Sequence, residues 1–176
     1  MALLKILRYP NPILKKKSTQ VKEFDENLHK ILDDMYETLM DSSGIGLAAI
    51  QVGIQKRIFL INLYREEDEL RHKEDLLEII NPVFLKKENA KMNQEGCLSV
   101  PDFYEEIERF SEVSIAYQNR YGEEKILKAD GLLAIALQHE NDHLDGILFI
   151  DRLPLLRRKK FEKELKRIQK EEKNKK

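Results

Sequence analysis

Two of the four histidines lie four residues apart in the segment LQHENDHLDG, residues 137–146. An α-helix turns by about 100° per residue, so on a helix His139 and His143 project from one face and can bind the same divalent ion. Glu140 follows the first histidine directly. A carboxylate at that position can transfer protons beside the ion without being a ligand.

A pair of hydrogen-bonded histidines on a helix surface is the simpler interpretation of this spacing. The surroundings argue against it, because Leu132, Ile135 and Ala136 share a helix face with His139. Imidazoles buried beside such apolar side chains need a partner. The sequence therefore favours a metal site, whereas His29 and His72 are expected to be surface residues.

A catalytic metal site uses three protein ligands and keeps one open position, so a third ligand is required. In one group of zinc peptidases the third ligand is a histidine six residues after the second histidine of the pair. In this chain that position holds Phe149. Another group uses a downstream glutamate; Glu162 and Glu164 are candidates, although their basic neighbours favour solvated ion pairs. Cys97, the single cysteine, is favoured over both because a thiolate suits Zn²⁺ or Fe²⁺.

Hydrophobic periodicity predicts the elements that must position these residues. It indicates a helix at 25–41 with Asp25 as its N-cap, and a strongly apolar helix at 130–144 that carries the two histidines. Short β-branched or alternating runs indicate strands at 56–62, 77–85, 105–119 and 125–129, with a charge-dense loop at 64–75. This order predicts an α+β fold, with mostly antiparallel sheets around a central metal-binding helix and a helix at the C-terminus.

The chain of 176 residues is long enough to bury one core. We expect residues 1–153 to form a single catalytic domain, and residues 154–176 to add a basic C-terminal helix and a frayed tail to the same domain. The formal net charge of −1 is unevenly distributed: residues 152–176 contain twelve Lys/Arg against four Glu, a net of +8, and the preceding residues carry −9.

The last helix, at 154–170, is expected to dock Phe161, Leu165 and Ile168 on the rest of the chain. Its basic side chains are expected to face outward: Arg157, Arg158, Lys159, Lys160, Lys163, Lys166, Arg167 and Lys170. A solvated helix face is the simplest role for such a charge run. A basic segment on an acidic chain would also orient the molecule toward a phosphate-rich surface.

No membrane or export signal is expected. The N-terminal run MALLKILRYPNP lacks the long apolar stretch and the cleavage site of a signal peptide, and no segment approaches the roughly 20 apolar residues of a membrane span. One cysteine cannot form an intrachain disulfide, which suits a reducing compartment. These features favour the cytoplasm.

The segment SGIGLAAIQVG, residues 43–53, concentrates small side chains before Gln51. It lacks the Lys-Ser/Thr ending of a phosphate-binding loop. Small residues allow a tight backbone passage and would let a substrate backbone approach closely. The amide of a buried Gln51 would offer a hydrogen-bond donor to a carbonyl oxygen.

Three segments in series, GIGLAAIQ (44–51), EGCLS (95–99) and QHENDH (138–143), resemble the three motifs of the peptide deformylases. The resemblance runs from residue 6 to about residue 153. It implies that Cys97, His139 and His143 bind a metal, natively Fe²⁺, with Zn²⁺, Ni²⁺ or Co²⁺ as alternatives. By the same resemblance Glu140 is the general acid/base, and Gln51 with the backbone N–H of Leu98 holds the developing oxyanion.

The resemblance also implies the substrate, which is the N-formyl-methionyl end of a nascent bacterial polypeptide, cleaved to formate and a free amine. The residues expected to contact it are Ile45, Gly46, Leu98, Leu132, Ile135 and Ala136. Some family members use a C-terminal helix near the ribosomal exit tunnel, and a cytoplasmic monomer is expected. Tyr104 departs from the members that carry an arginine there, which affects preference beyond the methionine.

Two other functions compete with this interpretation. One is a metallopeptidase that cuts internal amide bonds with Glu162 or Glu164 as a ligand. The other is a catalytically silent ribosome-binding protein, which only the basic tail supports.

Overall fold

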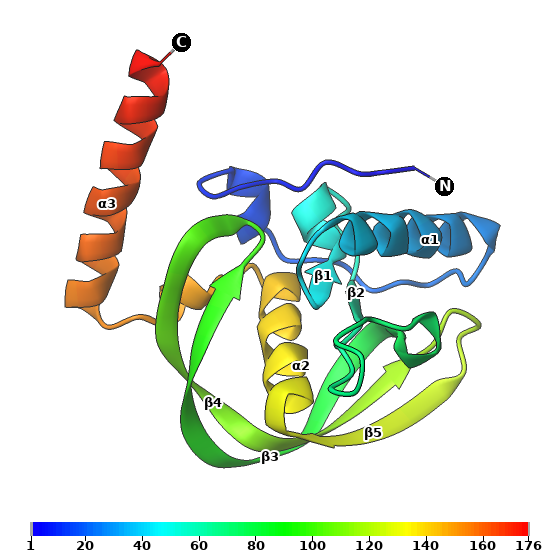
Figure 1. The fold of residues 1–176 in the computed structure, drawn as a ribbon. Helices are drawn as coiled ribbons and strands as arrows, with labels where there is room; N and C mark the ends of the chain where they lie inside the picture. The colour runs from blue at the N-terminus through cyan, green and yellow to red at the C-terminus, as the bar shows by residue number, and fades with distance from the viewer. Residues whose placement is uncertain (1, 176) are drawn as a thin grey trace.

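One antiparallel sheet of five strands, hydrogen-bonded in chain order, forms the centre of the fold. The computed structural model describes residues 2–175. The strands are β1 (Gly46–Ala48), β2 (Ile58–Ile61), β3 (Leu77–Cys97), β4 (Val100–Gln118) and β5 (Glu124–Asp130). The long β3–β4 hairpin curls around the helix α2, Gly131–Leu144 (Figure 1). The predicted α+β fold, with a mostly antiparallel sheet around a central helix, is confirmed.

The first helix, α1 (Glu26–Asp41), begins where the sequence predicts. The carboxylate of its N-cap, Asp25, accepts a hydrogen bond of 3.0 Å from the Leu28 N–H, which satisfies one of the free amides at the helix start. Its apolar face is buried in a cluster with β1 and β2 through Leu28, Leu32, Met35 and Leu39.

Helix α2 is buried along most of its length, as its apolar sequence predicts. Ala134, Leu137 and Leu144 pack in one cluster with Ile79 of β3 and Ile115 of β4. Full burial of each leucine contributes about 2 kcal/mol. This packing sets the rotation of α2, so that its remaining face carries the histidines.

Four short 3₁₀ turns connect these elements: η1 (Pro12–Lys15), η2 (Ala49–Val52), η3 (Lys73–Asp75) and η4 (Phe149–Arg152). Turn η2 carries Gln51 and ends at Gly53. The φ of Gly53 is 82°, in the left-handed region that glycine adopts at little cost. Turn η4 joins α2 to the last helix and contributes Phe149 and Ile150 to a third apolar cluster.

The C-terminal helix α3 (Leu155–Asn174) stands to one side of the sheet (Figure 1). Phe161 is buried against the rings of Tyr9 and Phe103, with centroid distances of 5.7 and 4.7 Å. Leu165 packs against the same cluster, and Ile168 is half-buried. The predicted start at 154 is one residue early, because Pro154 is the N-cap.

Two predictions for this helix are wrong. The helix continues to Asn174 rather than fraying after residue 170; an ion pair between Arg167 and Glu171 supports its last turns. Arg157 and Arg158 do not face solvent but are half-buried, because Arg157 pairs with Glu105 of β4 and Arg158 with Asp151 of η4.

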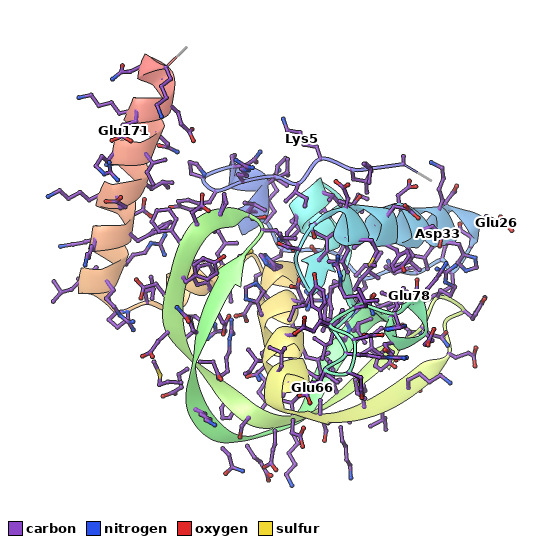
Figure 2. The ribbon with its side chains drawn as sticks, viewed as in Figure 1. Lys5, Glu26, Asp33, Glu66, Glu78 and Glu171 are labelled. Atoms are coloured by element: carbon purple, nitrogen blue, oxygen red, sulfur yellow. The ribbon has the colours of Figure 1, made fainter. Side chains whose placement is uncertain are left out.

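The predicted lysines of α3 are exposed: Lys159, Lys160, Lys163, Lys166 and Lys170. Figure 2 shows Glu171 near the far end of α3, away from the sheet. Within residues 2–175, none of the helices combines the length and the apolar character required to cross a bilayer.

Candidate metal centre and active site

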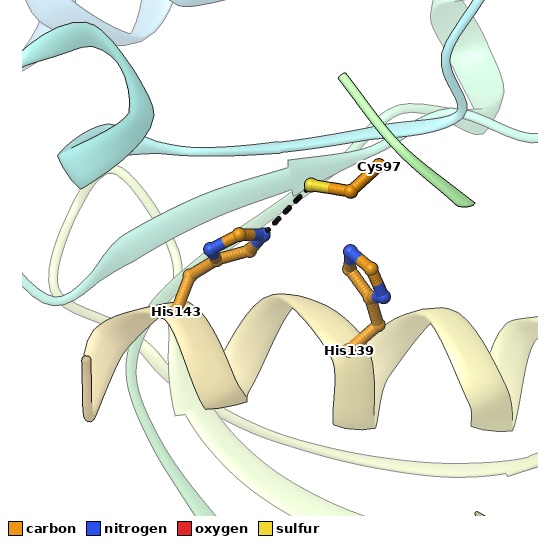
Figure 3. Close-up of side chains that lie close together, drawn as sticks. All are labelled: Cys97, His139 and His143. Carbon is orange, nitrogen blue, oxygen red and sulfur yellow. Dashed lines mark hydrogen bonds between the residues drawn. The ribbon is translucent and has the colours of Figure 1, made fainter. Parts of the chain in front are cut away.

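The structure brings Cys97, His139 and His143 together, although the cysteine is far from the histidines in sequence. Cys97 is the last residue of β3 and pairs with Val100 of β4 across a tight turn. The three potential ligand atoms lie within 4.8 Å of one another, and the Cys97 Sγ lies 3.5 Å from the His143 Nε2 (Figure 3). Ligands bound at about 2.0–2.3 Å from one ion have similar mutual spacings, so these donors fit a divalent metal.

Glu95 orients the first histidine. Its Oε1 lies 2.8 Å from the His139 Nδ1, an arrangement in which Nδ1–H donates and Nε2 is left free to bind a metal. Burial acts to raise the pKa of Glu95, but hydrogen bonds from His139 and Arg109 outweigh it and lower that pKa to about 2. Glu95 is therefore ionised at neutral pH.

Arg109 of β4 connects this strand to Glu95 of β3 and to helix α2. Its guanidinium donates to the two Glu95 carboxylate oxygens at 2.8 and 2.9 Å and to Asp142 at 2.6 Å. Arg152 donates to Asp142 from the other side at 2.7 and 2.8 Å. The side chains of Arg109, Glu95 and Asp142 are 3%, 5% and 9% exposed, so this part of the network is desolvated, whereas Arg152 is 42% exposed.

The site contains three residues that were not predicted from the sequence to belong to it: Glu95, Arg109 and Asp142. One signal was present, since Arg109 occupies an inward position of the alternating β4 run, on the same face as Ile107 and Val113. A charged residue at such a position requires a buried partner. The sequence does not show which carboxylates provide it.

The carboxylate of Glu140 lies against the backbone of β1. A Cβ on Gly46 would stand 2.6 Å from the Glu140 Oε1, so only glycine leaves room for it. The other oxygen, Oε2, is buried without a hydrogen-bond partner in residues 2–175. Burial raises the pKa of Glu140 to about 7.

His143 is almost fully buried, and burial lowers its pKa well below the ordinary value. The neutral imidazole is the form that binds metals. Its Nδ1 finds no hydrogen-bond partner among the described residues, so packing rather than a carboxylate holds this ring.

The amide of Gln51 is fixed in orientation by two neighbours. Its Oε1 accepts from the Ala48 N–H at 2.8 Å, and its Nε2 donates to the Ser99 Oγ at 3.1 Å. The same nitrogen lies 3.6 Å from the Cys97 Sγ. Gln51 therefore presents its amide donors, not its carbonyl, to the three-ligand cluster.

A cavity of about 160 Å³ adjoins these groups. Its lining includes all the residues predicted to contact substrate: Ile45, Gly46, Leu98, Leu132, Ile135 and Ala136. Gln51, Cys97, His139 and Glu140 line it as well.

A groove of about 1050 Å³ shares part of this wall. It is lined by the N-terminal segment 3–8, the end of α1 and the β3–β4 turn. The ring of Tyr104 packs over the Gly96 backbone in this groove.

The alternative third ligands lie elsewhere. Glu162 accepts a hydrogen bond of 2.6 Å from the Tyr9 hydroxyl, and Glu164 pairs with Arg167 of its own helix. Phe149 stacks on the His139 ring with centroids 6.2 Å apart. Of these residues, none belongs to the metal-type cluster found in residues 2–175.

Residues 3–159 match the family described as polypeptide deformylase. The chain belongs to the peptide deformylase family. It is 64% identical over 171 residues to the peptide deformylase of Helicobacter hepaticus, an alignment that covers 97% of this chain and 94% of the relative. The enzyme of Helicobacter pylori is 59% identical over 175 residues, with 99% and 100% covered.

A crystal structure of a peptide deformylase from Legionella pneumophila superposes with a TM-score of 0.88 at 35% identity, covering 97% of this chain and 98% of the other. Membership in the deformylase family confirms the resemblance drawn from the three motifs and makes the chain an enzyme. Its Cys/His/His cluster could hold the metal on which this family depends.

Proposed function

We propose that this deformylase hydrolyses the N-formyl group of formyl-methionyl nascent polypeptides and releases formate, using the cavity beside Cys97, His139 and His143. The observation that carries the proposal is a cluster of three metal-type donors beside one small cavity. Two of these donors, Cys97 and His139, line that cavity together with one buried carboxylate and one oriented amide. A volume of about 160 Å³ suits one side chain rather than a folded chain.

The three donors would hold one divalent ion. In the cell this ion would be Fe²⁺, and Zn²⁺, Ni²⁺ or Co²⁺ could replace it. When bound, such an ion acts as a Lewis acid that makes a water molecule more acidic and polarises the formyl oxygen. A Cys/His/His set suits several of these metals, so the choice of iron rests on the family resemblance.

Glu140 serves as the general acid/base. It accepts a proton from the attacking water and returns it to the amine that leaves when the formyl C–N bond breaks. A carboxyl whose pKa is raised to about 7 by burial can do both near neutral pH. The contact with Gly46 holds this carboxylate in place.

Gln51 and the backbone N–H of Leu98 stabilise the oxyanion that develops on the formyl carbonyl. The hydrogen bonds to Ala48 and Ser99 fix the Gln51 amide before substrate arrives. A donor oriented in advance needs no reorganisation in the transition state.

The methionine side chain would occupy the cavity, against Ile45, Gly46, Leu98 and the α2 residues Leu132, Ile135 and Ala136. The peptide would add to the free edge of β1 as an extended strand, and its following residues would enter the groove beside Tyr104.

We also propose that residues 1–153 and 154–176 form one domain, and that the enzyme is a cytoplasmic monomer. The buried contact of Phe161 with Tyr9 and Phe103 supports the single domain. The exposed lysines of α3 support contact with the ribosome near the exit tunnel.

Formate release from formyl-Met-Ala-Ser tests the proposed reaction against its rivals. The intact, metal-loaded enzyme should release formate, and the Glu140→Ala variant should not. Casein cleavage without formate would favour a metallopeptidase. Neither activity in a metal-loaded sample would favour a silent ribosome-binding protein.

Metal analysis of protein purified without oxygen tests the choice of iron. If Fe²⁺ is native, activity should decay in air as iron and Cys97 oxidise, and replacement by Ni²⁺ should protect it. An iron-loaded sample that keeps its full rate in air would contradict this assignment.

A further inference from the structure

The charged loop between β2 and β3 contacts the segment between α1 and β1, part of which lines the substrate cavity. Several of its charged residues pair within the loop, as Arg65 does with Glu74 and Asp75. Arg71 is different. Among residues 2–175 its guanidinium has no carboxylate within ion-pair distance and donates only to backbone carbonyls.

Two nitrogens of Arg71 reach four carbonyl oxygens. Nη1 donates to Leu39 at 3.0 Å and to Gly44 at 2.6 Å. Nη2 donates to Met40 at 3.2 Å and to Ser42 at 2.7 Å. The guanidinium also lies over the Tyr64 ring, 5.0 Å from its centroid, which favours its planar orientation.

These carbonyls belong to two parts of the chain. Leu39 and Met40 are in the last turn of α1, where a cation compensates the free carbonyls of the helix end. Ser42 and Gly44 belong to the 42–46 segment, which leads from α1 into β1. Arg71 therefore ties that segment to the helix end.

Other contacts from the same loop converge on the segment. The Tyr64 hydroxyl donates to the Ser43 carbonyl at 3.3 Å, and the Asn62 N–H donates to the Ile45 carbonyl at 2.8 Å. The Asn62 side chain in turn donates to the His72 carbonyl at 2.8 Å. The loop thus holds the outer side of the 42–46 segment.

The inner side of the segment forms the substrate site. Gly44, Ile45 and Gly46 line the cavity, and a Cβ on Gly44 would stand 2.8 Å from the Leu98 Cδ1. A shift of this backbone would move both the edge of β1 and the Leu98 side chain. Contacts on both sides leave the segment little freedom.

We propose that Arg71 is a positioning residue for substrate binding, which fixes the 42–46 segment in the conformation that receives the peptide. This rests on the proposed function, which places Ile45 and Gly46 against the methionine side chain and the peptide along the edge of β1. A planar guanidinium can serve carbonyls in two directions, whereas a lysine ammonium is a point donor on a flexible stem. Lysine should therefore replace it only in part.

Arg71→Ala should raise the KM for formyl-Met-Ala-Ser by about tenfold, because a backbone misplaced by part of an ångström weakens binding. The kcat should change by less than about threefold, because the pairing of Gly46 with Ile61 of β2 still holds Gly46 against Glu140. Metal content should be unchanged. The KM of Arg71→Lys should lie between those of the native enzyme and Arg71→Ala. The matched control is Arg65→Ala, which removes another arginine of the same loop and should keep the native KM.

Amide hydrogen exchange provides a readout that does not depend on activity. Exchange at Gly44, Ile45 and Gly46 should accelerate in Arg71→Ala and stay native in Arg65→Ala. If the intact enzyme released no formate, the proposed function would fail, while the exchange result would still decide whether Arg71 orders the segment.

The inference is overturned if Arg71→Ala lowers the unfolding temperature but leaves KM and exchange of the 42–46 segment unchanged, because Arg71 would then only cap α1. It is also overturned if Arg65→Ala raises KM equally. Should Arg71→Ala fail to fold, Arg71→Lys decides by the same two measurements.

Discussion

The thiol of Cys97 and the imidazoles of His139 and His143 receive different support from the rest of the chain. A hydrogen bond to ionised Glu95 orients His139, burial keeps His143 neutral, and Cys97 is held by its place at the end of β3. Removing the thiol leaves two imidazoles, which are too few to close a three-ligand site.

We therefore expect Cys97→Ala to lose most of the bound metal and all formate release. Glu140→Ala is the control, since it should keep the metal and lose only turnover. Metal content by elemental analysis, alongside formate release, separates the two. Full metal content in Cys97→Ala would remove this residue from the ligand set.

The close approach of Gly46 to Glu140 gives a second prediction at this scale. A methyl group at position 46 would stand 2.6 Å from the Glu140 Oε1, so Gly46→Ala must displace the carboxylate. We expect kcat to fall by about tenfold to a hundredfold, the scale for a misplaced catalytic group, with metal content retained. A kcat within about twofold of native would show that Glu140 tolerates the shift.

Near the metal ligands, the elements β4 and α2 are connected by ion pairs between side chains rather than by apolar packing. Arg109 reaches Glu95 of β3 and Asp142 of α2, and Asp142 lies between the two histidines in sequence. Such a buried network stabilises the fold less than its Coulomb energy suggests, but removing Arg109 takes a charged partner from two buried carboxylates. Glu95 would keep only its contact with His139, and Asp142 only its contact with Arg152.

Arg109→Leu should accordingly lower the free energy of unfolding by about 3–5 kcal/mol, the usual cost of removing one partner from a buried pair. Urea unfolding monitored by circular dichroism measures it. Arg167→Leu, which removes an exposed arginine of α3, should change that free energy by at most about 1 kcal/mol. Equal losses in the two variants would mean that the network is not effectively buried.

Over the whole molecule, positive charge is concentrated on α3. Arg157 and Arg158 are engaged in ion pairs, so the exposed lysines of α3 provide the surface that would meet ribosomal phosphates. Truncating α3 would be a poor test because it would expose the partners of the buried Phe161. Neutralising the lysines leaves that packing intact.

A variant with five of these lysines changed to glutamine should lose salt-sensitive co-sedimentation with ribosomes, while its turnover of formyl-Met-Ala-Ser stays within about twofold. The substituted positions are Lys159, Lys160, Lys163, Lys166 and Lys170. The matched control changes five exposed lysines of the sheet: Lys86, Lys87, Lys91, Lys125 and Lys128. If both variants sediment like the intact enzyme at low salt, the ribosome proposal is wrong.

Local patterns were sufficient to predict α1 with its Asp25 cap, the β4–β5 hairpin and the α2 face shared by Leu132, Ile135 and His139. These features depend on neighbours within a few residues, where helical and strand periodicity act. The motifs near Gln51, Cys97 and His139 were also sufficient to predict the family, which the comparison confirms.

Contacts between residues distant in sequence were decided only by the tertiary structure. Curling of the β3–β4 hairpin around α2 brings Glu95 to His139 and Arg109 to Asp142, and the loop after β2 brings Arg71 to Gly44. The same holds for Arg157, whose predicted exposure was wrong because Glu105 of β4 lies within its reach. Periodicity shows that a side chain faces inward, but its partner depends on strand register and helix packing, which involve the whole core.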